Sequence, residues 1–241
     1  MKLLIDMGNT AMKWCYGSAT TQHQVVIFPA RVNTDFFYSI WSGLDGVEVI
    51  WLSTVGSAAW LQHLQDYANT QGVPIIKAHS TLRFGPMRNA YKPPESLGVD
   101  RWLAAIAAWY RVRQAVIVVD AGTAITVDAV TDAGVFIGGV ILPGWMLCKQ
   151  ALVQGTAALE ISEVDDEEFP DTTSAAIHRG ALLAVVGGVQ AAVRSAESAL
   201  GGTCCHLLCG GDSTILQRHL APDTQCISDL VLRGLLQVAS D

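Results

Sequence analysis

Two short segments of this chain end an apolar run in aspartate and follow it with glycine and threonine. The first is Leu4-Ile5-Asp6-Met7-Gly8-Asn9-Thr10, and the second is Val118-Val119-Asp120-Ala121-Gly122-Thr123. Such apolar runs predict buried strands, and glycine lets the following turn approach a ligand closely. Two turns of this kind could hold the phosphates of a nucleotide from both sides. The pair therefore predicts a duplicated nucleotide-binding fold.

The first turn continues to Lys13 and carries several groups that suit phosphate binding. Asn9 and Thr10 offer short polar groups and backbone amides, and Lys13 would bring positive charge to the β- and γ-phosphates. Asp6 could hold Mg²⁺ directly or through water. An ordinary hairpin with an asparagine-based turn fits the same residues, so the segment by itself leaves both interpretations open.

A third group of residues lies between a proline-containing loop and an alanine-rich helix. It is Gly98-Val99-Asp100-Arg101, which places an aspartate and an arginine near a helix N-terminus, where anions are favoured. Asp100 could instead be a simple N-cap. An arginine at a helix start opposes the helix dipole unless it binds an anion, which favours a binding role. Further on, Gly138-Gly139 and Pro143-Gly144 either admit a ligand or serve as ordinary turn residues.

Strands and helices are expected to alternate along the chain. Strands are expected at 2–6, 13–16, 24–28, 47–52, 74–76, 116–120, 124–130, 135–142 and 203–209, with 116–142 forming a meander. Helices are expected near 35–41, 58–68, 101–113, 145–159, 174–200, 213–220 and 229–238, and Gly187-Gly188 could interrupt the fifth. Residues 88–97, which contain two prolines, and the acidic segment 162–171 are expected to be loops.

Composition limits the classes of protein to consider. The chain has 241 residues, of which 51% are hydrophobic and 15% are charged, and this is typical of a globular protein with a large core. Its net charge of −7, without a basic stripe, argues against nucleic-acid binding. Asp6 interrupts the apolar N-terminus, and the weakly polar stretch 181–193 is too short to span a bilayer. We therefore expect a cytoplasmic protein that does not bind membranes.

Four neighbouring residues, Cys204, Cys205, His206 and Cys209, resemble a metal-binding cluster. They lie within an expected strand, however, and side chains alternate between the two faces of a strand. Because the four side chains could not converge on one ion, we expect packed thiols in a reducing compartment and no metal site.

Each half of the chain begins with strand, turn and strand. This layout predicts an α/β protein with mixed sheets flanked by helices, repeated once, with halves at 1–113 and 114–241. The layout resembles the duplicated actin-like, or ribonuclease H-like, architecture of sugar kinases and heat-shock proteins.

Taken together, the motifs resemble those of the type III pantothenate kinases, in order and from Lys2 to about Leu236. The matching segments are Asp6–Lys13, Tyr91 with Pro94, Leu97–Arg101, Asp120–Ala124, Gly138–Gly144, Thr173–Gly180 and Gly210–Asp212. The chain departs from the family pattern at Leu159-Glu160, where Leu-Pro is common, at the bulky Trp145 and Met146, and in a short segment between Asp6 and Gly98. These departures affect loop shapes and remove no candidate catalytic residue.

The resemblance implies ATP-dependent phosphorylation of the pantothenate hydroxyl, the first step of coenzyme A synthesis. It implies that ATP, with Mg²⁺, is bound by Asp6, Met7, Gly8, Asn9, Thr10, Ala11, Met12, Lys13 and Thr123. Pantothenate would be bound by Tyr91, Gly98, Val99, Asp100 and Arg101, with Asp100 accepting the hydroxyl proton. Asp120 would ligate a monovalent cation, K⁺ or NH₄⁺, and Thr173 would reach pantothenate in the partner subunit of a homodimer.

Two other functions fit parts of the sequence. Another small-molecule kinase of the same superfamily, for example a sugar kinase, would share the phosphate turns. A regulatory protein could keep the fold and lose the chemistry, although Asp6, Asp100 and Asp120 are all present. A dinucleotide-binding dehydrogenase is disfavoured because no Gly-x-Gly-x-x-Gly follows the first strand.

Overall fold

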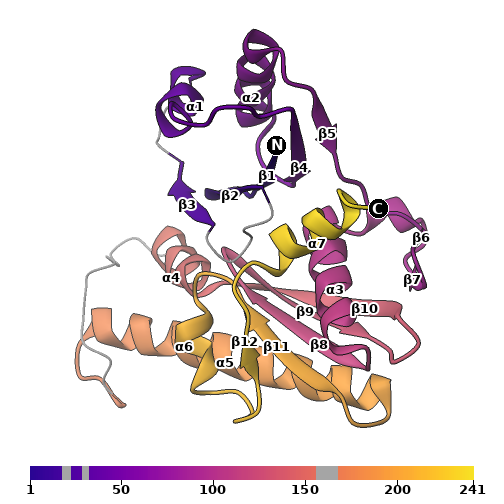
Figure 1. Ribbon diagram of the computed structural model, residues 1–241. Coiled ribbons are helices and arrows are strands. Elements are labelled where there is room, and N and C mark those ends of the chain that lie inside the picture. Colours follow the sequence, from indigo (N-terminus) through magenta and orange to yellow (C-terminus); the bar gives the residue numbers. More distant parts are fainter. Residues whose placement is uncertain (18–22, 29–32, 156–167) are drawn as a thin grey trace. The chain divides into compact units, whose positions relative to one another are not determined.

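The computed structural model describes residues 1–17, 23–28, 33–155 and 168–241 (Figure 1). The chain forms two compact units. Unit 1 comprises Met1–Arg113, Ala133–Ile137 and Ser228–Asp241, and unit 2 comprises Gln114–Asp132 and Gly138–Ile227. The chain passes from one unit to the other after Arg113, and its last residues return to unit 1.

Unit 1 is built on a five-stranded mixed sheet with the order β3-β2-β1-β4-β5. Its strands are β1 (Lys2–Met7), β2 (Ala11–Tyr16), β3 (Gln24–Ile27), β4 (Val49–Thr54) and β5 (Ile75–Lys77). The first three strands are antiparallel neighbours, whereas β4 runs parallel to β1 and β5 parallel to β4. All five strands lie where the alternating and apolar runs of the sequence predict them.

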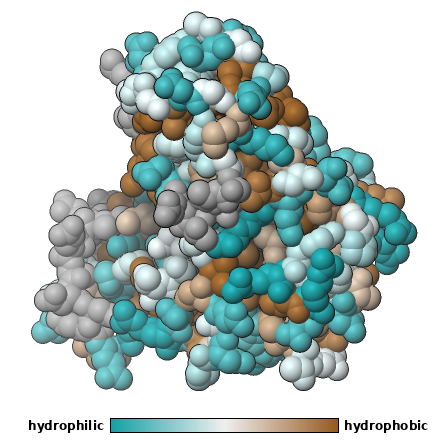
Figure 2. Space-filling model, in the orientation of Figure 1, coloured by the Kyte–Doolittle hydropathy of each residue, from teal (hydrophilic) through white to brown (hydrophobic). Residues whose placement is uncertain are grey.

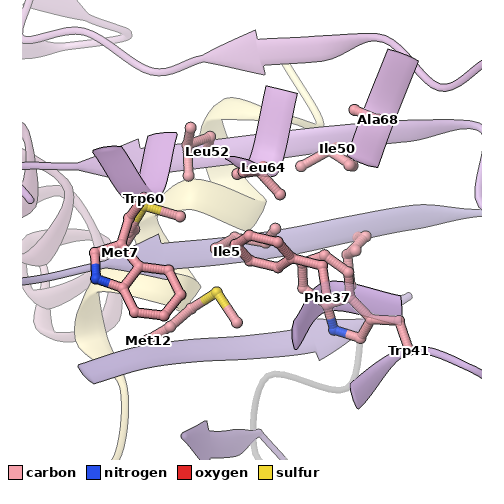
Figure 3. Close-up of a cluster of buried hydrophobic side chains, with 11 residues drawn as sticks. Ile5, Met7, Met12, Phe37, Trp41, Ile50, Leu52, Trp60, Leu64 and Ala68 are labelled. Carbon is pink, nitrogen blue, oxygen red and sulfur yellow. The ribbon is translucent and has the colours of Figure 1, made fainter. Parts of the chain in front are cut away.

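One face of this sheet packs against the helices α1 (Asp35–Ile40) and α2 (Ala58–Gln71), as Figure 3 shows. The buried cluster comprises Leu3, Ile5, Met7, Met12, Phe37, Trp41, Ile50, Leu52, Trp60, Leu64 and Ala68. Alternate residues of a strand face opposite sides of the sheet. Because Ile5 and Met7 face this core, Asp6 between them faces the other side.

The helices α3 (Val99–Val112) and α7 (Leu230–Val238) pack closely against each other in unit 1. Gly234 makes this packing possible, because a Cβ atom there would lie 2.0 Å from the carbonyl oxygen of Leu103. α7 also contacts β1, β2 and β4. The end of the chain therefore lies against the strands that carry Asp6 and Lys13.

The sequence predicts a loop at residues 88–97, and this prediction is wrong for residues 88 and 89, which belong to a strand. A short hairpin, β6 (Arg83–Phe84) and β7 (Met87–Asn89), precedes a 3-10 turn at Pro94–Ser96. β7 pairs in parallel with Val135 and Phe136, the first residues of β10 (Val135–Pro143). A partner so distant in sequence leaves no local pattern from which the strand could be predicted.

The second mixed sheet has seven strands in the order β12-β11-β8-β9-β10-β7-β6, of which β6, β7 and the first residues of β10 belong to unit 1 and the rest to unit 2. Its other strands are β8 (Val116–Ala121), β9 (Ala124–Val130), β11 (Cys205–Cys209) and β12 (Gln225–Cys226). β8 and β9 are antiparallel, and β8, β11 and β12 run parallel. The expected meander of β8, β9 and β10 is confirmed, whereas the two-residue strand β12 was not predicted.

The two sheets share one topology. In each, a strand forms a hairpin with the next strand, a third strand lies beside the second, and two later strands lie in parallel on the other side of the first. β1 thus corresponds to β8, and Asp6 corresponds to Asp120 near the end of that strand. The fold is mixed α/β with two mixed sheets flanked by helices, as the repeated aspartate motif predicts.

Three helices, α4 (Trp145–Gln154), α5 (Thr173–Leu200) and α6 (Ser213–Gln217), belong to unit 2. α5 runs unbroken through Gly187-Gly188, so the possible interruption there does not occur. Its Val185 and Val189 enter the core formed with β8 and β9. The expected end of α4 at 159 and most of the acidic segment 162–171 lie outside the described residues.

The length of α5 corrects one argument from the sequence. The helix has 28 residues, and by length and composition alone it is long and apolar enough to cross a membrane. The stretch 181–193, which is too short by itself, is only part of this helix. A third of its most apolar window, 33%, is buried within the protein, where it packs on the unit 2 sheet.

Candidate active site

The turn that we predict to bind ATP phosphates, residues 6–13, joins β1 to β2. The amide of Gly8 donates a hydrogen bond to the carbonyl of Ala11 at 3.0 Å, which closes the turn, and Asn9 and Thr10 are exposed at its tip. Met7 and Met12 also lie in the predicted ATP-binding segment, but their side chains are fully buried in the core. Only the backbone of these two methionines is therefore suited to contact a nucleotide.

Asp6 is held by its neighbours on the sheet. Ser53 on β4 is its parallel partner, and the Ser53 hydroxyl, which is fully buried, donates a hydrogen bond to Asp6 Oδ1 at 3.0 Å. Across the antiparallel pair, Asp6 lies opposite Lys13. Sequence reasoning missed Ser53, because a serine in an apolar run carries no signal until its strand neighbour is known.

A glycine after β4 supports the same turn. A Cβ atom on Gly56 would lie 2.4 Å from the carbonyl oxygen of Gly8, so no larger residue fits there. The preceding amide, of Val55, donates to the carbonyl of Met7 at 3.3 Å. Gly56 was not predicted either, because the contact joins segments that are distant in sequence.

Asp100 lies in the first turn of α3, which begins at Val99, two residues earlier than predicted. The N-cap of the helix is Gly98, so the alternative in which Asp100 is the N-cap is wrong. Asp100 Oδ1 accepts a hydrogen bond from the amide of Arg101 at 2.8 Å. A Cβ atom on Gly98 would lie 2.6 Å from the same oxygen, so this glycine leaves the space in which the carboxylate sits.

Arg101 and Tyr91, both predicted to bind substrate, meet in the structure. Arg101 is buried, and its Nη1 donates to the Tyr91 hydroxyl at 3.2 Å. The guanidinium carbon lies 5.8 Å from the centre of the Tyr91 ring and 5.9 Å from that of Phe136. The site therefore holds a guanidinium that is largely removed from water and lies beside two aromatic rings that contact each other.

A buried asparagine fixes the loop that carries Tyr91. Asn89, 1% exposed, accepts a hydrogen bond from the Tyr91 amide and donates one to the Pro94 carbonyl, both at 3.0 Å. Sequence reasoning missed Asn89. One signal could have identified it. Asparagine side chains often accept a hydrogen bond from the backbone two residues later, and Asn89 lies two residues before Tyr91 in a proline-containing segment.

The second turn that we predict to bind phosphates follows β8 in unit 2 and is built like the first. The amide of Gly122 donates to the carbonyl of Ala124 at 3.1 Å, and the amide of Gly144 donates to the carbonyl of Thr123 at 3.1 Å. A Cβ atom on Gly210 would lie 2.3 Å from the carbonyl oxygen of Ala121. The glycines of Pro143-Gly144 and Gly210-Gly211 therefore let two segments pack directly on the turn after Asp120.

Two further residues of the motif segments, Asp212 and Thr173, also lie in unit 2. The amide of Asp212 donates to the Ala121 carbonyl at 2.9 Å, and burial raises the pKa of its carboxyl group. Thr173, the first residue of α5, is exposed. Among the predicted site residues, Asp120, Thr123 and Thr173 belong to unit 2 and the others to unit 1.

Three residues of the cysteine cluster, Cys205, His206 and Cys209, lie in the predicted strand β11, and Cys204 directly precedes it. Cys204 Sγ lies 3.5 Å from His206 Nε2, which also lies 3.2 Å from Glu197 Oε1. Burial, and then the charge of Glu197, raise the pKa of the Cys204 thiol. Within the described part of the chain, no group of three or more histidine, cysteine or acidic residues is arranged to hold a metal ion.

Comparison with solved structures finds this fold in proteins with different described functions. A Campylobacter jejuni protein assigned to the Baf family of transcriptional activators has a TM-score of 0.62 and 22% identity, covering 99% of this chain and 97% of its own. A Listeria monocytogenes protein described as an N-acetylmannosamine kinase has a TM-score of 0.51 and 13% identity, covering 99% of both chains. At these identities the likeness concerns the fold.

Comparison of sequences gives a more specific result. A model of the type III pantothenate kinase family matches residues 2–195. Type III pantothenate kinases from Chromobacterium violaceum and Thiobacillus denitrificans are 34% and 32% identical, covering 100% and 99% of this chain and 100% and 96% of their own lengths. On this similarity over its full length, the chain belongs to the type III pantothenate kinase family.

Proposed function

We propose that this protein transfers the γ-phosphate of ATP to the hydroxyl of pantothenate, with Asp100 as the general base. The observation that carries this proposal is the arrangement at the start of α3, where the Asp100 carboxylate accepts a hydrogen bond from the backbone amide of Arg101 and the buried Arg101 side chain bonds to Tyr91. A carboxylate next to an anion-binding arginine can bind an acidic substrate and take up the proton of its hydroxyl. Membership in the pantothenate kinase family supports this choice of substrate.

The turn from Asp6 to Lys13 suits the phosphates of ATP. Asn9 and Thr10 are exposed at its tip, and Lys13 lies on the strand that leaves it. In unit 2, Thr123 lies in the equivalent turn and would contribute its hydroxyl. Phosphoryl transfer depends on positioning and charge neutralisation more than on covalent chemistry, so two such turns supply most of what the reaction requires.

Asp6 fits a Mg²⁺ ion that accompanies ATP. Mg²⁺ in kinase sites is commonly held by one or two carboxylates together with substrate phosphates and water. Asp6 provides a carboxylate that is fixed by the Ser53 hydroxyl and lies directly before the phosphate turn. When bound, the ion would neutralise the phosphate charge.

The pantothenate subsite would be formed by Tyr91 and Gly98–Arg101. Arg101 is 8% exposed, and a guanidinium that has lost most of its hydration gains from pairing with a carboxylate. Pantothenate carries such a carboxylate. Asp100 would then accept the hydroxyl proton as the hydroxyl oxygen forms a bond to the γ-phosphorus and ADP departs.

Asp120 is the residue we assign to a monovalent cation, K⁺ or NH₄⁺. It lies near the end of β8, one residue before the Ala121 carbonyl and beside a turn whose carbonyl oxygens are closely packed. Carboxylate and carbonyl oxygens are suitable ligands for hard cations. The bound cation would offset negative charge near the phosphates.

We also propose a homodimer that forms through α5. Its face opposite the core is exposed and consists mostly of small or apolar residues, namely Ala176, Gly180, Leu183, Ala184, Gly187 and Ala191. Two large apolar residues of unit 2 are exposed, Ile141 on β10 by 62% and Leu183 on α5 by 56%. Figure 2 shows that hydrophobic residues lie among hydrophilic ones on the face drawn. In an isologous dimer Thr173 would reach the partner's substrate.

We expect this enzyme in the cytoplasm, where ATP is supplied.

One assay tests the proposed function. ATP consumption is measured with and without pantothenate, in potassium and then in sodium buffer, with glucose and N-acetylmannosamine as alternative acceptors. We expect consumption that requires pantothenate and is faster in potassium than in sodium. Faster turnover of a sugar would support the sugar kinase alternative, and equal rates in both salts would remove the cation from the mechanism.

A further inference from the structure

Asp229 has an unusual backbone conformation just before α7. Its φ and ψ angles are 56° and 55°, in the left-handed region, which costs a non-glycine residue about 1 kcal/mol or more. It occupies the N-cap position of α7 but makes no capping hydrogen bond with its side chain. An aspartate at this position usually accepts bonds from the helix amides, so this carboxylate is directed elsewhere.

The carboxylate points to the strand that carries Lys13. Asp229 Oδ1 lies 3.8 Å from Lys13 Nζ, and its side chain is only 2% exposed. Lys13 also lies opposite Asp6 on the neighbouring strand. The ammonium group is therefore placed between a buried carboxylate from the end of the chain and the carboxylate that precedes the phosphate turn.

Two other residues, His23 and Cys15, also lie near the Asp229 carboxylate. Nδ1 of His23, next to β3, contacts the second oxygen of the carboxylate. Cys15 lies two residues after Lys13 on the same face of β2, and its thiol pKa is raised to about 11, mainly by burial and also by the negative charge of Asp229. The carboxylate thus lies over the face of β2 that is opposite the Met12 core.

We infer that Asp229 is a positioning residue for the ATP site, one that holds the ammonium group of Lys13 beside the strand that leaves the phosphate turn. This inference rests on the proposed role of Lys13 in binding the ATP phosphates. An ammonium group has three donors and can bond to a carboxylate and a phosphate oxygen at the same time. Lys13 can therefore keep its contact with Asp229 while it binds a phosphate oxygen.

Removal of the Asp229 charge should therefore affect ATP more than pantothenate. In Asp229→Asn, Lys13 would lose its buried charged partner, and its ammonium group would no longer be held in one position for the ATP phosphates. We expect kcat/KM for ATP to fall about tenfold, within the range of coupling between neighbouring groups, while KM for pantothenate changes less than about twofold. Asparagine is close to aspartate in size and tolerates the left-handed conformation, so the turn should persist.

A merely structural role for Asp229 would give a different result. Arg233→Gln is the matched control, because Arg233 Nε donates to the Ser228 carbonyl at 3.0 Å and supports the same turn without adding to its negative charge. This control should leave both KM values unchanged. In a Lys13→Met background, Asp229→Asn should cause no further loss in kcat/KM for ATP.

The experiment measures steady-state kinetics for these variants, together with calorimetric binding of a non-hydrolysable ATP analogue in Mg²⁺. We expect weaker analogue binding by Asp229→Asn and by Asp229→Gly, which tolerates the backbone conformation without strain. Equal losses for both substrates, additive losses with Lys13→Met, or unchanged or tighter analogue binding would overturn the inference. A wild-type protein that binds the analogue but does not phosphorylate pantothenate would contradict the proposed function alone.

Discussion

At the scale of single residues, the candidate site depends on neighbours that hold or make room for its charged groups. Asp6 is held by Ser53, Tyr91 by Asn89, and the Asp100 carboxylate occupies space left by Gly98. The charged residues themselves could be proposed from the sequence. An aspartate directly after an apolar run, or an arginine at a helix start, is uncommon enough to indicate a binding role. Their supports could not be proposed in this way, since a serine or asparagine becomes meaningful only when its spatial partner is known.

The role of Asp100 can be tested by removing its capacity to accept a proton. Asp100→Asn keeps the size of the side chain, and its amide oxygen can still accept the bond from the Arg101 amide. We expect kcat to fall by about 10²- to 10⁴-fold, the usual contribution of a general base, with little change in Tm. A variant that keeps near-normal kcat on pantothenate would show that Asp100 is only part of the helix start.

Gly98→Ala tests the placement of the same carboxylate without changing it chemically. The backbone angles of Gly98 suit alanine, but the added methyl would lie 2.6 Å from Asp100 Oδ1 and turn that side chain away. We expect a loss of about tenfold or more in kcat, since small misplacements of a reacting group are costly. Thermal unfolding should be close to wild type. An unaffected kcat would mean that the carboxylate reacts from a different position than the one beside Gly98.

At the scale of elements, local pattern predicted most strands and helices, including the turn-flanked strands β1 and β8 that carry the two key aspartates. It failed where pairing is distant in sequence. β7 is a strand because it pairs with Val135 and Phe136, and β12 is one because it pairs with β11. α5 continues through two glycines because its Val185 and Val189 are packed into the unit 2 core on either side of them.

The contact between α3 and α7 gives a prediction at this scale. Gly234→Ala would place a methyl 2.0 Å from the Leu103 carbonyl, a backbone atom that cannot move alone. We expect a loss of about 2–4 kcal/mol in the free energy of unfolding, as for other overpacked sites, measured by urea denaturation. The same substitution at Gly43, where no described atom lies within 4 Å of the added methyl, should be close to neutral. Equal stability of the two variants would contradict the close packing.

At the scale of the whole molecule, the repeated aspartate motif predicted the repeated topology of the two sheets. The sequence did not indicate that residues 228–241 return to unit 1, because the pattern of a short amphipathic helix does not identify the element that it packs against. That return brings Asp229 to Lys13. The proposed dimer rests on a similar argument, because the small residues of α5 permit close contact on its exposed face.

Shared active sites can be tested by mixing two inactive variants, Asp100→Asn and Thr173→Trp. If Thr173 reaches the partner's substrate, a mixed dimer contains one site with both wild-type residues, and activity should return to about a quarter of the wild-type value after free subunit exchange. Sedimentation should show a dimer. A monomer, or no recovery after verified exchange, would exclude a shared site.

The central claim is tested most directly by identifying the product. The wild-type protein is incubated with ATP, Mg²⁺, K⁺ and pantothenate, and the phosphorus-containing products are followed by ³¹P nuclear magnetic resonance and mass spectrometry. We expect one phosphate monoester on the pantothenate hydroxyl for each ADP formed. ADP with free inorganic phosphate, or no conversion of pantothenate by a folded protein that binds ATP, would contradict the assignment.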